Sequence, residues 1–391
     1  MTDDLDSCLD VYLAAQQRFD RLRADAARQA GTALADLAYA NAYDGPPPEV
    51  LDALRDCLSS ERSLALQYTP YGGSTITRRL VATDLSAQLP MRLEWRDVIM
   101  TPGAMAALNV VFRALRTNEG RDEVIVIVPA WLDYPLYLVN LGLKPVFVQL
   151  DAQTLRLDLE RIRAAIGPAT RAVVLSQPAN PTGLVYSAEE LNQLGALLED
   201  CSGGRIMLIS DECHRDLTFD GQRFVPPAAH YANTCIVYSF GKRFLIQGQR
   251  CGYVAVSPRM PGHRDFRERL ERFCRIMGFC TPTSVMQLAV ARLLAIPSDG
   301  SRFASRRQHV LAALDHGGYS YPKPQATFFI YPRVPGGDEE QFTRRLAERG
   351  VLVLPAAVFH HSGYFRLALT APDDHIERAA GVLTALGEIR Q

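Results

Sequence analysis

The chain has 391 residues, a length that allows two or three domains. With 48% apolar and 22% charged residues it can bury a large core, which argues against disorder and against a fibrous repeat. The formal net charge of −1 provides no basic excess, so a nucleic-acid partner is disfavoured. The chain has only three lysines, so lysine-dependent chemistry has three candidates: Lys144, Lys242 and Lys323.

Eight cysteines are scattered without a Cys-x-x-Cys pair, which is typical of reduced, mostly buried thiols in the cytoplasm. The acidic start, Met1 to Asp4, lacks the basic and apolar parts of a signal peptide. The most apolar stretch, 124–143, contains two prolines, Asp133 and Asn140, and therefore predicts strand, loop and helix rather than a membrane span. We expect a cytoplasmic protein with no membrane partner.

Residues 7–30 have the pattern of a charged amphipathic helix, and a proline-rich loop at 45–48 leads into another. Short β-branched runs then alternate with helical patterns, at 98–101, 124–128, 145–149, 171–175, 205–210, 234–238 and 253–256. Ser187 and Glu190 fit a capping box at the start of one such helix. Continuous apolar strands between helices predict an α/β fold, with a mostly parallel seven-stranded sheet sandwiched by helices.

Two further helices are expected at 264–277 and 284–295, and beyond them the pattern changes to that of a smaller α+β domain. After residue 300 come a helix and then a strand, helix, strand and helix, at 327–331, 339–349, 351–354 and 374–387. We therefore expect a large domain at 45–295, a small domain at 296–391, and an N-terminal helix and arm at 1–44 that belongs with the small domain.

The sharpest chemical signal is the segment 238–242, Tyr-Ser-Phe-Gly-Lys, which ends a strand. A lone lysine at a strand end is usually a solvated surface residue. Here Ser239 precedes Lys242 by three residues, and Arg250 follows it by eight among glycines. A lysine amine can form a Schiff base with an aldehyde cofactor. A hydroxyl and a guanidinium nearby can hold a phosphate.

This segment resembles the lysine motif of the class I and II aminotransferases, which are pyridoxal-phosphate-dependent enzymes of fold type I. The resemblance covers residues 35–385, and its other motifs follow in the family's order. It implies that the cofactor, pyridoxal 5'-phosphate, is held by the large domain on Lys242, which later moves the proton at Cα. It also implies that Ser239 and Arg250 hold the cofactor's phosphate.

Residues 101–108, Thr-Pro-Gly-Ala-Met-Ala-Ala-Leu, follow a strand and open a helix, where free N–H groups attract anions. Alone this would be an ordinary turn. The resemblance implies a phosphate cradle made by Gly103 and the backbone amides of Ala104 and Met105. Trp131 follows the next strand and would by itself be a core aromatic, whereas the resemblance implies that it stacks on the pyridine ring.

Residues 177–183, Gln-Pro-Ala-Asn-Pro-Thr-Gly, would alone be a turn. They resemble the family's Asn-Pro-x-Asn-Pro-Thr-Gly motif, with Gln177 in place of the first asparagine. The resemblance implies that Asn180 bonds the cofactor's phenolic oxygen and lies at the substrate. Asp211 ends a strand and could simply cap a helix. In the family this carboxylate pairs with the pyridine nitrogen and keeps the ring an electron sink.

His214 stands three residues after Asp211, where the family usually has a tyrosine that donates to the phenolic oxygen. An imidazole can also donate, but it titrates with a reference pKa of about 6.5. If His214 reaches the cofactor, its protonation should act there between about pH 5 and 8. The alternative is a histidine that only packs beside the site.

Two further segments resemble parts of the family that bind across subunits and at the substrate. Tyr68 precedes a glycine pair, and the resemblance implies that it reaches the phosphate of the partner subunit, hence a homodimer with composite active sites. A surface turn is the alternative. Arg366 lies on an apolar strand and would need a partner if buried. The resemblance implies that it binds the substrate α-carboxylate. Upstream, Ala356 replaces a glycine of the family pattern.

These features predict an enzyme of amino acid metabolism that moves an amino group between an L-amino acid and a 2-oxo acid. The departures at Gln177, His214, Gly241 and Ala356 are typical of a divergent enzyme in a specialised biosynthetic pathway. The alternative is a lyase, β- or γ-replacement enzyme, cyclase or amino-acid oxidase on the same fold. No metal-ligand spacing, Gly-x-Ser-x-Gly or Gly-x-Gly-x-x-Gly motif points to other chemistry. A DNA-binding regulator that keeps the fold is disfavoured, because only about forty residues precede the cofactor domain and the net charge is not basic. A catalytically inactive scaffold is disfavoured, because both Lys242 and Asp211 are present.

Overall fold

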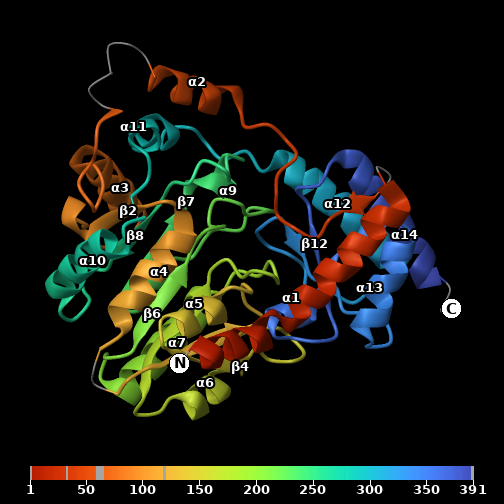
Figure 1. The fold of residues 1–391 in the computed structure, drawn as a ribbon, viewed down its shortest axis with the longest axis horizontal. Helices are drawn as coiled ribbons and strands as arrows, with labels where there is room; N and C mark the ends of the chain where they lie inside the picture. The colour runs from red at the N-terminus through yellow and green to blue at the C-terminus, as the bar shows by residue number, and fades with distance from the viewer. Residues whose placement is uncertain (1, 32–33, 59–65, 118–119, 280, 389–391) are drawn as a thin grey trace.

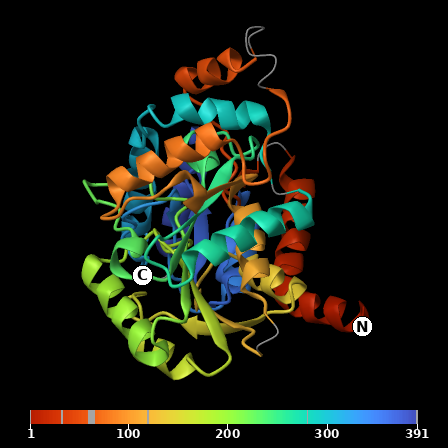
Figure 2. The ribbon, with the colours of Figure 1, turned by 90° about the vertical axis from the view of Figure 1, so that its left-hand side faces the viewer.

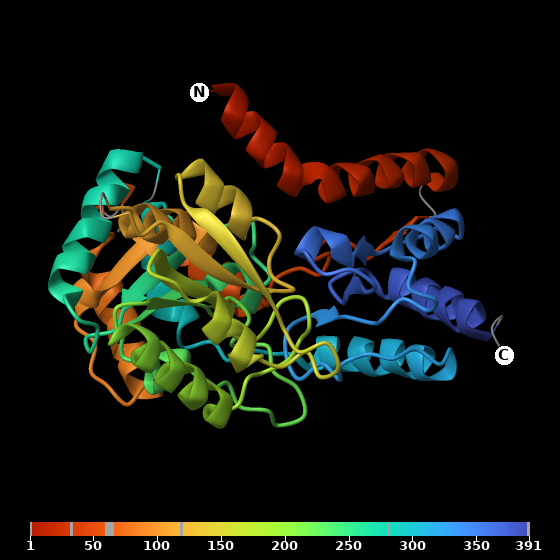
Figure 3. The same cartoon turned by 90° about the horizontal axis from the view of Figure 1, so that it is seen from below.

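The structure is a computed structural model that describes residues 2–31, 34–58, 66–117, 120–279 and 281–388. Figure 1 shows a larger part built on one wide sheet and a smaller part made of helices and short strands beside it. The helix α1 (Thr2–Ala30) lies on the outside and extends along both parts, as Figure 3 shows. Among the helices of the described ranges, none has the length and apolar character needed to cross a membrane.

The wide sheet has seven strands in the order β2-β8-β7-β6-β5-β3-β4. β8 runs antiparallel to both of its neighbours, and the other pairings are parallel. All seven expected strands are present, and most are longer by one or two residues. Their bounds are β2 Val98–Thr101, β3 Glu123–Val128, β4 Lys144–Gln149, β5 Thr170–Ser176, β6 Met207–Asp211, β7 Thr234–Ser239 and β8 Gly252–Val256.

Helices cover both faces of this sheet, because its strands are apolar on both sides. In β3, Val126 packs in the cluster that includes α4 and α10, whereas Ile125 packs in the cluster that includes α7. Figure 2 shows α7 and α10 on opposite sides of the sheet. The helices of this part are α2 Pro48–Asp56, α3 Thr75–Gln88, η3 Trp95–Asp97, α4 Gly103–Leu115, α5 Tyr134–Asn140, α6 Leu159–Ala165, α7 Ala188–Ser202, α8 Pro227–His230, α9 Phe240–Arg243, α10 His263–Met277 and α11 Ser284–Leu293.

The capping box expected before α7 is confirmed. The Ser187 side chain accepts the N–H of Glu190, and the Glu190 carboxylate accepts the N–H of Ser187. Gly203 ends the helix in the left-handed conformation with φ 57°.

The smaller part has two short sheets, β1-β10 and β11-β12-β9. The expected strand at 327–331 is shortened to Phe329–Ile330, because Thr327 has a left-handed backbone with φ 69° that interrupts the extended run. The bounds are β1 Ala35–Asp36, α12 Ser301–His316, β9 Phe329–Ile330, α13 Glu339–Glu348, β10 Val351–Leu352, β11 Leu354–Pro355, η4 Ala356–Phe359, β12 Phe365–Ala368 and α14 Asp373–Glu388.

The N-terminal helix contacts both parts of the molecule through one aromatic side chain. The ring of Tyr12 in α1 lies 6.0 Å from Phe147 of β4 and 5.8 Å from His360, which follows η4. Phe147 and His360 stack with their centroids 4.3 Å apart. The Gln149 side chain also donates to the His360 carbonyl at 2.9 Å. This junction fixes the segment before β12 against the edge of the wide sheet.

Candidate active site

A cavity of about 180 Å³ lies at the carboxyl ends of the central parallel strands, where the loops after β3, β5, β6 and β7 meet the start of α4. Nine of the side chains or backbone positions expected from the sequence line it: Ala104, Met105, Trp131, Asn180, Asp211, His214, Ser239, Lys242 and Arg250. The structure thus brings together residues spread over almost 150 positions. Crevices at this edge of an α/β sheet are where such folds bind ligands.

Lys242 lies in the short helix α9, directly after β7 ends at Ser239. The Ser239 side chain accepts the N–H of Gly241 at 3.4 Å and so caps the turn that carries the lysine. The Lys242 amine lies 2.7 Å from Nε2 of His214. The other two lysines do not line this cavity; the side chains of Lys144 and Lys323 are 68% and 75% exposed.

Asp211 is buried at the carboxyl end of β6 and has two hydrogen-bond donors. Its Oδ2 accepts the hydroxyl proton of Tyr134 at 2.6 Å, and its Oδ1 accepts the N–H of Cys213 at 3.1 Å. Burial, with Asp211 beside it, raises the pKa of Tyr134 well above its usual value, so the phenol stays protonated. The two hydrogen bonds fix the orientation of the carboxylate that lines the cavity.

The imidazole of His214 is fully enclosed. Its ring meets the rings of Phe328 and Phe329 edge-on, at centroid distances of 5.0 and 5.4 Å. Burial, and the charges of Lys242 and Arg366, lower the pKa of His214 well below its usual value. This shift acts against protonation of the ring near neutrality, and the effect of His214 on the cofactor between pH 5 and 8 stays a prediction.

The start of α4 offers unpaired N–H groups beside a cation. Pro102 precedes the helix and no side chain caps it. Gly103 has φ 78°, and a Cβ on it would lie 2.7 Å from the Arg250 guanidinium, so the glycine lets this cation approach the helix start. Arg250 is held by the Gln247 carbonyl at 2.6 Å. Helix N–H groups and a guanidinium together favour a phosphate.

Trp131 stands after β3 and forms one wall of the cavity. The rings of Tyr134 and Tyr137 pack edge-on against it, with centroids 5.4 and 5.6 Å away. These two contacts from α5 fix the plane of the indole and leave it facing the cavity, as a ring that stacks on a flat ligand must be.

Asn180 joins the cavity to a buried arginine. Its Oδ1 accepts a hydrogen bond from Arg366 at 3.2 Å, and the Ala38 carbonyl accepts a second one at 2.9 Å. The guanidinium packs over the rings of Phe329 and Phe359, and its Nε has no partner among the described atoms. Burial lowers the pKa of Arg366 to about 9. No carboxylate of the described residues pairs with it, which is the state of a group that awaits an anion.

The unusual Gln177 has a structural role. Its side-chain amide donates to the carbonyls of Tyr186 and Val225 at 3.0 and 3.1 Å and accepts the Tyr186 N–H at 3.0 Å. These bonds close the 177–186 turn that positions Asn180. The departure from the family pattern is thus satisfied within the fold.

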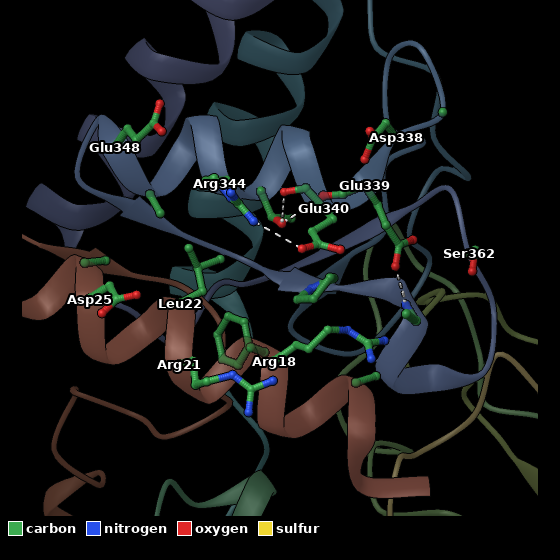
Figure 4. A pocket seen from close by; sticks show the side chains of 18 of the residues that line it. Arg18, Arg21, Leu22, Asp25, Asp338, Glu339, Glu340, Arg344, Glu348 and Ser362 are labelled. Atoms are coloured by element: carbon green, nitrogen blue, oxygen red, sulfur yellow. Dashed lines mark hydrogen bonds and ion pairs between the residues drawn. The ribbon is translucent and has the colours of Figure 1, made fainter. Parts of the chain in front are cut away.

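Glu339 supports the segment that leads to Arg366. Its carboxylate, seen in Figure 4, accepts the backbone N–H groups of Ala357 and Gly363 at 2.9 and 2.7 Å. Burial raises the pKa of this carboxyl. It borders a separate cleft of about 770 Å³ between α1 and α13, lined by charged side chains of both signs such as Arg18, Arg344 and Glu340.

Ala356, in place of the family's glycine, is fully buried in η4.

Tyr68 does not line the cavity of its own chain; its side chain is completely exposed. Its neighbour Thr69 accepts a hydrogen bond from the Gln287 side chain at 3.0 Å, and Gln287 also accepts the Ser74 N–H. The segment is therefore held in place while Tyr68 points outward.

Several residues of the site were missed from the sequence. Tyr134 lies in the same turn as Trp131, and its place three residues later was the available signal. The Ala38 carbonyl and the ring of Phe329 are distant in sequence from Arg366, so no local pattern links them. In the parts of the chain that the structure describes, no three His, Cys, Asp or Glu side chains gather as metal ligands.

The model of the family described as aminotransferase class I and II matches residues 35–383. The chain belongs to this family. Aspartate aminotransferases of Geobacillus stearothermophilus and Bacillus subtilis are 28% and 27% identical to it, over 85% of this chain and 86% of each relative. An amino transferase structure from Eubacterium rectale has a TM-score of 0.90 at 26% identity, over 95% of each chain. The structure of the Thermus thermophilus aspartate aminotransferase with maleate has a TM-score of 0.83 at 25% identity, over 94% of this chain and 96% of that one.

This aminotransferase uses pyridoxal phosphate, and amino-group transfer is its activity rather than the lyase, cyclase or oxidase alternatives. The residues present fit the cofactor. The cavity offers the Lys242 amine for the cofactor's aldehyde. It also offers the Asp211 carboxylate, which is held by two hydrogen bonds, for the ring nitrogen. For its phosphate, Gly103 leaves the room beside Arg250 that a Cβ would fill.

Proposed function

We propose that Lys242 carries the cofactor of this aminotransferase and that the same amine moves the proton at Cα of the substrate. The observation that carries the proposal is the position of Lys242 in the one cavity that also holds Asp211 and the open start of α4. The exposure of Lys144 and Lys323 supports it, because neither solvated amine is near these groups.

The remaining roles follow from where each group lies along the cavity. Gly103, the amides of Ala104 and Met105, Ser239 and Arg250 would hold the phosphate. Asp211, fixed by the Tyr134 hydroxyl, would pair with the ring nitrogen. Trp131 would stack on the ring, and Asn180 and His214 would lie at its phenolic side.

The chemistry that pyridoxal phosphate supplies when bound is to take up the electron pair left at Cα. The protein then has to orient the substrate and move one proton. Arg366 would bind the α-carboxylate with its fixed fork of donors, with Asn180 beside it. Lys242 would act first as a general base that accepts the Cα proton. It would then act as a general acid that releases this proton to the carbon of the cofactor's former aldehyde group.

The test is the pair of half-reactions with purified holoenzyme. A preferred L-amino acid should convert the cofactor to its amine form, and a 2-oxo acid should return it. Aspartate is the first amino acid to assay, since the relatives carry that name. Formation of ammonia, peroxide or a cyclised product without amine-form cofactor would contradict the proposal.

We also propose a homodimer in which Tyr68 completes the phosphate site of the partner subunit. The full exposure of Tyr68 supports this, as does the exposure of apolar side chains around it on the same chain, Tyr71, Ile276 and Phe279. Arg275 packs over the Tyr71 ring, which places α10 beside this segment. A hybrid of one Lys242→Ala subunit and one Tyr68→Phe subunit should regain one intact site. Hybrids no more active than either parent would contradict it.

The domain division and the location complete the proposal. The seven-stranded sheet falls within 45–295, and the pairing of β1 with β10 supports grouping 1–44 with 296–391. A cytoplasmic location is supported by the free thiols at 201, 213, 235 and 251. Cys280 lies outside the described residues. Limited proteolysis and thiol titration of the purified protein test these two points.

A further inference from the structure

In the hydrogen bond between Lys242 and His214, the chemistry of the two groups determines which nitrogen donates and which accepts. Nζ and Nε2 are 2.7 Å apart, a good hydrogen-bond distance. A protonated lysine has three N–H donors and no acceptor, whereas a neutral imidazole has one nitrogen of each kind. The imidazole nitrogen that faces Nζ must therefore accept when the lysine is protonated.

The surroundings disfavour a charged His214, and the contact with Lys242 selects between the two tautomers of the neutral ring. Both charged groups that act on it, Lys242 and Arg366, are cations, and the ring is buried. A proton on Nε2 would meet the ammonium of Lys242, so the single proton of the ring belongs on Nδ1. Nδ1 is buried and has no hydrogen-bond partner among the described residues.

The ring is also held in this orientation from behind. Phe328 and Phe329 meet it edge-on, and both follow Thr327, whose φ of 69° is rare for a β-branched residue. The Thr327 N–H donates to the Leu217 carbonyl at 2.7 Å, and its hydroxyl accepts the N–H of Phe329 at 3.0 Å. The two rings are thereby fixed against the imidazole.

We propose that His214 is a positioning residue for proton transfer, a neutral acceptor that holds one N–H of Lys242 on its Nε2. The inference rests on the proposed function of Lys242. With one N–H held, the lone pair of the free amine is restricted in the directions it can point. The proton taken from Cα stays on Nζ until Lys242 releases it, and His214 keeps its own proton on Nδ1 throughout. The family's usual tyrosine would place a hydroxyl donor here instead.

The tautomer can be measured on the cofactor-free protein, without any catalysis. Protein labelled with ¹⁵N-histidine should show, for His214, a protonated Nδ1 and an unprotonated Nε2. The same pattern should hold from pH 6 to 8.5. His214→Gln, which removes one of the eight histidines, assigns the signals. A proton on Nε2 would overturn the proposal, since that nitrogen could not accept from Lys242.

The kinetic test compares His214→Phe, which keeps a flat ring without polar atoms, with His214→Gln, whose amide oxygen can accept. Displacing a reacting group by about 1 Å costs about a hundredfold in rate. We expect a loss of about that size in the half-reaction of the Phe variant at saturating amino acid. The Gln variant should recover at least tenfold of it. Deuterium at Cα should slow the Phe variant more than the wild type, because proton transfer becomes more limiting.

A Phe variant with the wild-type rate and isotope effect would overturn the inference. If the Phe variant loses its cofactor, the test depends on the ¹⁵N measurement of the tautomer and on the half-reaction rate of the Gln variant. A Gln variant as slow as a Lys242→Ala protein would contradict the inference. These outcomes differ from failure of the proposed function, in which the wild type itself gives no half-reaction or carries the cofactor on another lysine.

Discussion

Tyr134 donates its hydroxyl proton to Asp211 across 2.6 Å, which ties the first turn of α5 to the end of β6. The carboxylate also accepts the N–H of Cys213. A phenol that donates a hydrogen bond to a buried carboxylate fixes the orientation of that carboxylate. The strength of the pairing with the ring nitrogen should therefore depend on Tyr134.

Tyr134→Phe should weaken cofactor binding about tenfold, since a hydrogen bond to a charged group contributes about 1.5–3 kcal/mol, part of which is lost in both the free and bound states. Equilibrium dialysis of pyridoxal phosphate measures the change. Tyr137→Phe is the matched control, because it removes the same hydroxyl from the other tyrosine packed on Trp131. Equal affinities for the two variants would show that the Tyr134 bond does not support the cofactor.

Arg366→Ala should raise KM for amino acids by about a hundredfold or more, because a forked, charge-assisted contact to the α-carboxylate is lost. The cofactor should remain bound. The KM of Arg366→Lys should lie between those of the wild type and the Ala variant, since an ammonium keeps the charge but not the forked pair of donors. Steady-state kinetics with a fixed 2-oxo acid give both values. An unchanged KM in the Ala variant would assign the carboxylate to another residue.

The same substitution should leave the fold intact. The guanidinium is buried without an ion-pair partner among the described residues, so removing it leaves no carboxylate uncompensated. The thermal midpoint of the cofactor-free Ala variant should therefore match or exceed that of the wild type. A large drop would mean that the arginine is structural and would weaken the kinetic interpretation.

The sequence was informative where chemistry needs a residue type at the end of an element. Lys242, Asp211 and Asn180 each follow an apolar strand, and parallel strands carry such residues to one edge. It was not informative about contacts made across the fold. Thr327 has a left-handed backbone and donates its N–H to the distant Leu217 carbonyl, which no local pattern contains. The contacts of Phe329 with His214 and Arg366 likewise join distant segments.

The histidine illustrates the same limit in its electrostatics. From the residue type alone, a pKa near neutrality was expected. Two cations and complete burial lower it instead, and both causes come from distant segments. The expected helix at 7–30 was nearly right, because its amphipathic pattern is local; the helix begins at Thr2.

The depressed pKa of His214 predicts how stability depends on pH. In the unfolded chain this imidazole takes up a proton below about pH 6.5. In the folded protein its pKa is lower, so protonation needs a lower pH. Stability from this residue is thus fully present above about pH 6.5 and is lost as the pH falls toward the folded pKa. As the pH falls below about 6.5, the cofactor-free wild type should lose more unfolding free energy than His214→Gln, as measured with urea. Parallel losses would contradict a buried neutral ring.

The central claim is that Lys242 carries the cofactor, and one measurement tests it directly. Borohydride reduction of the holoenzyme fixes pyridoxal phosphate to the amine that holds it, and peptide mapping by mass spectrometry then locates the label. The chain offers only three lysine amines, so the outcome is unambiguous. We predict label on Lys242 and none on the two exposed lysines. Label on Lys144 or Lys323, with Lys242 unmodified, would contradict the account.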